Sequence, residues 1–112
     1  MLTEKDYCDY DICVALKKFG LKWDCDENDM LECKAARPSL YIAQKFLREE
    51  KKIEVNATYD NVVELHWHWY MKSLTNRNQT TSIINYDSYE QALLAGIKEA
   101  IEILKENETI HE

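Results

Sequence analysis

The sequence holds little glycine and proline and has no long apolar run. Its 112 residues include two glycines and one proline, which leaves no composition for a long flexible linker. No apolar stretch approaches the roughly 18 to 20 residues that a membrane span needs, and the polar, acidic residues 1–11 do not resemble a signal peptide. We therefore expect a single domain over residues 1–112, located in the cytoplasm and without a membrane partner.

Basic residues are also scarce. Lysine and arginine number 14 against 21 aspartates and glutamates, giving a formal net charge of −7. This balance argues against non-specific binding to nucleic acid or to anionic membrane, because both would repel the chain. The basic cluster consists of Lys45, Arg48, Lys51 and Lys52. Glu49 and Glu50 interleave with it, so we interpret it as a solvated helix face and keep nucleic-acid binding as the alternative.

Motifs of catalysis and of zinc binding are missing. The chain has no glycine-rich phosphate loop, no paired-carboxylate motif and no recognisable nucleophile, which favours a non-enzymatic protein without a cofactor. Its four cysteines are separated by spacings that differ from the short ligand pairs of zinc fingers, so we expect free thiols: Cys8, Cys13, Cys25 and Cys33. On the apolar face of the first helix, Cys13 is expected to be a small buried hydrophobe.

The first third of the chain predicts a helix followed by a hairpin. Apolar positions recur at helical spacing from Asp9 towards Gly20, where a helix end is expected. Between residues 21 and 34, apolar and polar residues alternate around an acidic turn, which indicates a short hairpin. Such a hairpin would bring Cys25 close to Cys33. Residues 1–35 thus form an N-terminal extension of the core.

Residues 39–105 predict the core of the fold. Ser39 begins a helix, and period-two alternation then predicts strands over 53–59, 63–71 and 81–86. Ser88 and Gln91 form a capping-box pattern at the start of a second helix, 88–105, which precedes a polar tail over 106–112. The expected fold is α+β: a three-stranded antiparallel meander with both helices covering one face and Trp67 and Trp69 beneath them.

The other face of the second strand carries the most informative constellation. Side chains two apart on a strand point the same way, so four polar residues share this face: Glu64, His66, His68 and Tyr70. Two imidazoles at this spacing could share a metal ion, and the four groups together could bind a small molecule, although period-two alternation alone also produces the pattern. The alternative is an amphipathic, aromatic-rich surface, extended by Tyr86, that binds a protein or a second copy of the chain. We favour this alternative and expect no bound metal.

The order helix, strand, strand, strand, helix resembles a double-stranded RNA-binding domain. That family grips phosphate with a basic run at the start of its last helix, whereas residues 87–91 here are Asp-Ser-Tyr-Glu-Gln. The resemblance implies the topology and not the RNA site. Nucleic-acid binding would have to use the basic cluster on the first core helix.

Three longer blocks carry a second resemblance: ALKKFG, RPSLYIAQKFLREEKKIEV and YDSYEQALLAGIKEAIEIL. They resemble recurring blocks of small uncharacterised proteins encoded in phages and integrated mobile elements of gut Bacteroidetes. The resemblance implies an accessory protein of such an element and provides no catalytic residue. Combined with the residue pattern, it predicts a protein-interaction module whose partner is a host or element-encoded protein or a second copy of the chain.

Overall fold

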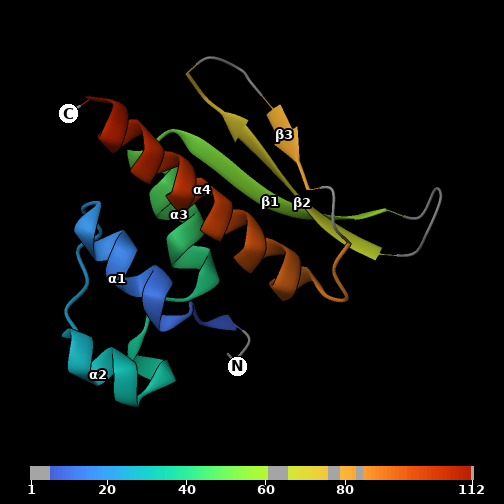
Figure 1. Cartoon of the computed structure of the whole chain (residues 1–112). Coiled ribbons are helices and arrows are strands. Elements are labelled where there is room, and N and C mark those ends of the chain that lie inside the picture. Colours follow the sequence, from blue (N-terminus) through green and yellow to red (C-terminus); the bar gives the residue numbers. More distant parts are fainter. Residues whose placement is uncertain (1–5, 61–65, 76–78, 83–84, 112) are drawn as a thin grey trace.

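The chain folds as an α+β domain. The structure is a computed structural model that describes residues 6–60, 66–75, 79–82 and 85–111. Within these residues the elements are, in order, α1 (Tyr10–Lys18), α2 (Glu27–Glu32), the short 3₁₀ helix η2 (Lys34–Ala36), α3 (Leu40–Glu50), β1 (Ile53–Asp60), β2 (His66–Ser73), β3 (Gln79–Thr81) and α4 (Tyr89–His111). The predicted α+β fold with three antiparallel strands is confirmed (Figure 1).

The sheet is a meander in the order β1-β2-β3. Strand β1 pairs with β2 without a bulge, from Ile53 opposite Ser73 to Asp60 opposite His66. Paired residues point to the same face, so this register puts Val55 with Met71 and Ala57 with Trp69 on one side. Among the described residues after β3, Tyr86 forms an isolated bridge with Trp67.

Helix α4 lies on that apolar side of the sheet at unusually short range. Gly96 faces the strands, and a Cβ atom added to it would lie 2.7 Å from Val55 Cγ1 and 3.0 Å from Trp69 Cβ. Only a residue without a side chain allows this approach, which explains why glycine occupies a helix interior. The contact buries Trp69, as predicted, and Met71, whereas Trp67, which was also predicted to lie beneath the helices, is half-buried.

The N-terminal third packs beside the helices. Helix α1 contacts α2 and α4, and Cys8 N donates to Pro38 O at 3.0 Å, joining the first residues to the start of α3. The described residues before α3 therefore pack against the helices, at a distance from the face of the sheet opposite α4 (Figure 1).

Helix α3 runs beside β1, and its Gln44 Nε2 donates to Val55 O at 2.7 Å.

Three predicted details are wrong. The hairpin over 21–34 is replaced by α2, because the Asp26 side chain accepts from Asp29 N at 2.8 Å and so caps a helix. Cys25 and Cys33 lie beyond opposite ends of this helix, which rises about 9 Å over six residues, so they cannot form a disulfide without refolding.

The other two corrections concern element ends. Strand β3 begins at Gln79, two residues before the predicted strand 81–86. Helix α4 continues through the predicted tail to His111. The predicted cap of α4 is confirmed: Gln91 N donates to Ser88 Oγ at 3.2 Å, while Gln91 Oε1 accepts from Asp87 N at 3.2 Å.

The substitution Gly96→Ala tests the close packing. Alanine gains about 1 kcal/mol of helix propensity, but its Cβ has no room against Val55, and overpacking costs about 1–3 kcal/mol. We expect a net fall in the free energy of unfolding, measured by urea denaturation. The loss should shrink in a Val55→Ala background, which removes the nearest methyl group. A more stable Gly96→Ala protein would contradict this packing.

Candidate functional site

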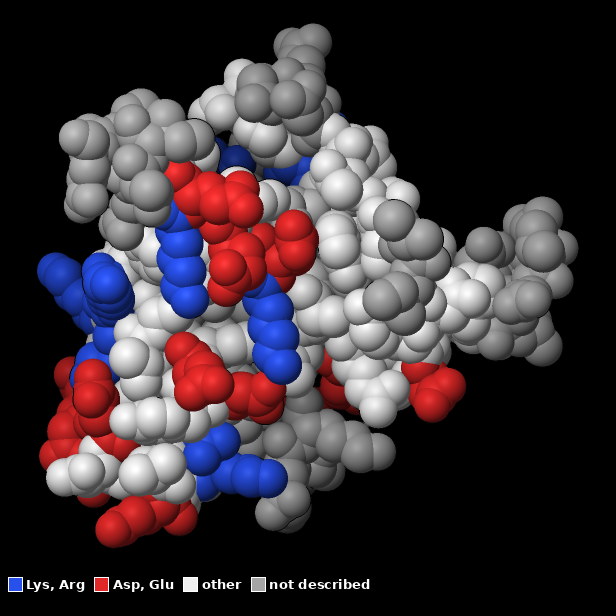
Figure 2. Space-filling view, viewed as in Figure 1, with Lys and Arg blue, Asp and Glu red and all other residues white. Residues whose placement is uncertain are grey.

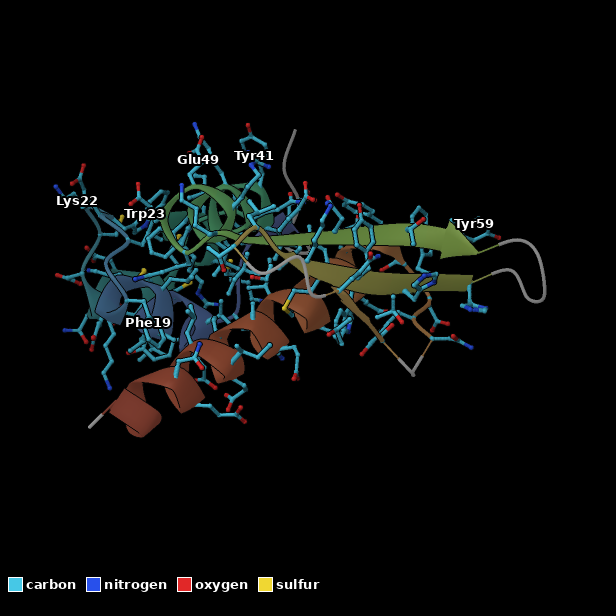
Figure 3. The ribbon with its side chains drawn as sticks, turned by 90° about the horizontal axis from the view of Figure 1, so that it is seen from above. Phe19, Lys22, Trp23, Tyr41, Glu49 and Tyr59 are labelled. Atoms are coloured by element: carbon cyan, nitrogen blue, oxygen red, sulfur yellow. The ribbon has the colours of Figure 1, made fainter. Side chains whose placement is uncertain are left out.

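The face of the sheet away from α4 is the candidate site, and we call it the open face. The residues of this face whose side chains the structure describes alternate with the buried ones along each strand: Glu54, Asn56 and Thr58 on β1, His66, His68, Tyr70 and Lys72 on β2, and Gln79 and Thr81 on β3. In Figure 3 the two long strands lie in front of α4. Helix α3 lies beside the first part of β1, and past its end no described helix crosses the strands. Seven of these nine side chains are hydroxyl, amide or imidazole groups, so the face is polar without being strongly charged.

The structure brings His66, His68 and Tyr70 together as predicted. The two imidazole centroids are 6.3 Å apart with their planes tilted by 53°, and all three side chains are half-buried. Glu64, the fourth predicted member, lies outside the described residues.

Two imidazoles supply fewer ligands than the three or four that zinc sites in proteins use. Among the described residues, no three His, Cys, Asp or Glu side chains are placed to hold a metal ion. The histidine pair therefore provides, from the described part of the chain, an incomplete ligand set.

A hydrogen-bonded chain of side chains stiffens the open face. Gln44 Nε2 lies 2.7 Å from Asn56 Oδ1, and Asn56 Nδ2 donates to Tyr70 Oη at 3.3 Å. The Tyr70 ring is therefore connected across β1 to α3. The sequence analysis missed both Gln44 and Asn56, because no local pattern reveals that a glutamine on a preceding helix reaches around the strand edge.

The open face is less acidic than the protein as a whole. Among the residues whose side chains the structure describes, it carries one carboxylate, Glu54, and one ammonium group, Lys72, which are paired across the strands. Asp60, opposite His66, adds a second carboxylate position at the end of β1. The whole chain carries −7. Figure 2, which views the protein from the side of α4, shows acidic and basic side chains intermixed over the helices. Charge depletion of this kind is characteristic of the core of protein interfaces.

Tyr86 lies apart from the other predicted residues. Its backbone pairs with Trp67, through Tyr86 N to Trp67 O at 2.8 Å and Trp67 N to Tyr86 O at 3.0 Å. Because paired residues share a face, Tyr86 is on the side covered by α4, where it packs against the core.

That side also carries an aromatic row that the sequence analysis did not identify. The Tyr59 and Trp67 ring centroids are 5.1 Å apart, and the Tyr89 ring meets Trp67 edge-on at 5.6 Å. Tyr59 and Tyr89 remain 44% and 39% exposed. We call Tyr59, Trp67 and Tyr89 the aromatic row.

The basic cluster is engaged in local contacts. The Lys51 ammonium group lies 5.9 Å from the ring centroids of both Phe19 and Phe46, and Lys52 Nζ donates to Glu49 O at 2.9 Å. Lys45 is exposed and Arg48 half-buried. Two of the four cations are thus held against their own helix or the core.

Two of the four cysteines form a buried pair. Cys8 and Cys13 are 1% and 0% exposed, with Cys13 Sγ 3.8 Å from Cys8 O. The hydrogen bond between the thiols, together with burial, raises the pKa of Cys8. The same hydrogen bond, aided by the Arg37 charge, lowers the pKa of Cys13. With no access from solvent, neither sulfur is placed to act as a nucleophile.

No protein-family model, curated protein or solved structure matches the chain. No helix in the described part is both long and apolar enough to cross a bilayer.

The accessibility of the thiols is testable by alkylation. In native buffer, iodoacetamide should modify the exposed Cys33 first and the half-buried Cys25 next, leaving Cys8 and Cys13 unmodified. Peptide mass spectrometry locates each adduct. In denaturant all four cysteines should react. A Cys33→Ser variant should lack only the fastest phase of the alkylation reaction. Alkylation of Cys8 or Cys13 as fast as Cys33 would show that the N-terminal segment does not bury them.

Proposed function

We propose that this chain is a non-enzymatic protein-interaction module that binds its partner with the open face. The observation that carries the proposal is a rigid sheet surface that is polar and, over its described side chains, nearly uncharged, on a protein that is otherwise acidic. Such a surface loses little desolvation energy on binding, because it holds few charges that must be paired. The resemblance to proteins of phages and mobile elements supports an accessory role in the cytoplasm of a bacterial host.

The partner we propose is a protein with a neutral or basic surface. A chain of charge −7 attracts a basic surface at long range and does not repel a neutral one, and hydrogen-bonding groups on the open face can then set the partner's orientation. Tyr70 is the expected anchor, because its ring is half-buried and its hydroxyl is already positioned by Asn56.

A second copy of the chain is the alternative partner. The sheet face, with strands of eight residues, measures about 26 Å by 14 Å, which is small beside the roughly 800 Å² per partner that a stable interface buries. A dimer formed by this face alone would be weak.

Metal binding remains a second candidate function, because His66 and His68 share the face at 6.3 Å. Native mass spectrometry of the untagged protein, purified without chelator, decides between the two. The interaction module predicts a metal-free mass. A monomer carrying one zinc ion, lost when His66 and His68 are both replaced by alanine, would favour the metal site instead.

Binding by the open face is tested with matched single-charge variants. His68→Glu places a carboxylate at the centre of the open face, whereas Ala35→Glu adds the same charge on exposed η2, away from the sheet. Immobilised wild type and both variants are incubated with a lysate of a gut Bacteroidetes species, and retained proteins are quantified by mass spectrometry.

We expect a partner retained by the wild type and by Ala35→Glu but reduced about tenfold by His68→Glu, corresponding to about 1.4 kcal/mol. The purified partner should then show the same ratio of dissociation constants. If no retained protein distinguishes His68→Glu from Ala35→Glu, the open face is not the binding surface.

A further inference from the structure

The outer edge of β1 presents unpaired backbone groups over Ala57 and Tyr59. Val55 O accepts from Gln44, so the Val55 carbonyl points away from β2. Because backbone groups alternate direction along an antiparallel strand, the N–H and C=O groups of Ala57 and Tyr59 point the same way. The bonds of β2 confirm this direction. Trp67 and Trp69 are the partners of Tyr59 and Ala57. Their backbone groups bond to Tyr86 and Ser82, on the side of β2 away from β1.

Helix α3 covers only the first part of this edge. Gln44 reaches Val55 and Asn56, and β1 continues beyond the end of α3 in both ribbon views, as far as Tyr59 (Figures 1 and 3). In the described part of the chain, no hydrogen bond reaches the outward N–H or C=O of Ala57 or Tyr59. Four strong hydrogen-bonding groups are thus available along about 7 Å of strand.

This segment lacks the features that normally protect an edge strand. Natural edges are interrupted by proline, lysine or a bulge, or are covered by a helix or loop. Here residues 57–59 are Ala-Thr-Tyr, and the pairing with β2 is continuous. The edge is therefore ready to accept another strand.

The side chains beside this edge differ on its two faces. On the α4 side lies the aromatic row, with Tyr59 at the edge itself. On the open face lie Thr58 and, paired with it, His68. A strand added to β1 would place alternate side chains against the aromatic row and against these polar groups.

We infer that the edge of β1 at Ala57 and Tyr59 binds an extended peptide segment of the partner protein by β-strand addition. The peptide alternates an apolar side chain, which contacts Tyr59 and Trp67, with a polar one beside Thr58. It is neutral or basic, because the chain carries −7. This inference rests on the proposed function, and it adds the binding mode and the kind of segment that is bound.

A second copy fits this edge less well than a peptide does. Two copies bring together two charges of −7, and α3 limits the free edge to the end of β1, so two β1 strands could pair over only a few residues. A short peptide needs no more than these few residues.

The test uses a displayed library of random 12-residue peptides selected on the wild-type protein. Enriched peptides are synthesised, and their dissociation constants are measured by fluorescence anisotropy for wild type, Ala57→Pro and Ala57→Val. Proline removes the outward N–H of Ala57 without affecting the bonds to β2, since Ala57 makes none of them. Valine is the matched control, because it adds bulk of similar size and keeps the N–H group.

We expect enriched peptides with period-two alternation, bound at least about tenfold more weakly by Ala57→Pro and within about threefold of wild type by Ala57→Val. Amide exchange on the unmodified protein provides a readout that does not depend on either variant folding: the peptide should protect the Ala57 and Tyr59 amides.

Three outcomes would overturn the inference. One is that no peptide is enriched, and another is that Ala57→Pro binds as tightly as wild type while Ala57 and Tyr59 remain unprotected. The third is self-association of the free protein that Ala57→Pro abolishes, which would make a second copy the occupant. If peptides bind Ala57→Pro as tightly as wild type but no longer bind His68→Glu, the inferred binding at the β1 edge is wrong, while the proposed binding by the open face still holds.

Discussion

The close contact between Gly96 and the sheet determines which surfaces this protein can offer. Helix α4 approaches Val55 and Trp69 at a distance that admits no Cβ atom, and it covers the apolar side of β1 and β2 together with α3, which also contacts β1. The N-terminal segment then packs against α4, through α1, and is joined to the start of α3 by the bond from Cys8 N to Pro38 O, rather than lying across the strands. The opposite side of the sheet is left as a polar surface, and the far end of β1 extends beyond the helices.

The parts of this arrangement that follow local periodicity were predictable from the sequence. Alternation gave β1, β2 and the face of His66, His68 and Tyr70, and the Ser88 capping pattern gave the start of α4. The segment before α3 was misread because Trp23 and Cys25 mimic strand alternation, while the Asp26 cap favours a helix. The free strand edge could not be predicted, because it depends on the register between β1 and β2, which decides which backbone groups point outward, and on how far α3 covers the edge through Gln44, 11 residues away from Val55.

The candidate surfaces form one continuous region of the sheet. Thr58 belongs to the open face and lies between Ala57 and Tyr59, whose backbone forms the free edge, and Tyr59 begins the aromatic row on the other side. A partner that adds a strand here would also contact His68 on the neighbouring strand. Backbone bonds would then supply affinity, and side chains on the two faces would supply specificity. In this account the histidine pair acts as hydrogen-bonding surface rather than as a metal site.

Residue-resolved amide hydrogen exchange of the free protein, followed by NMR, tests the central claim most directly. The account predicts that the Ala57 and Tyr59 amides exchange rapidly, while the Asn56 and Thr58 amides, which bond to β2, are strongly protected. A fast-slow alternation of this kind would establish the free edge without knowledge of any partner. Strong protection at all four positions would show that the edge is already occupied in the isolated chain, and it would contradict the account.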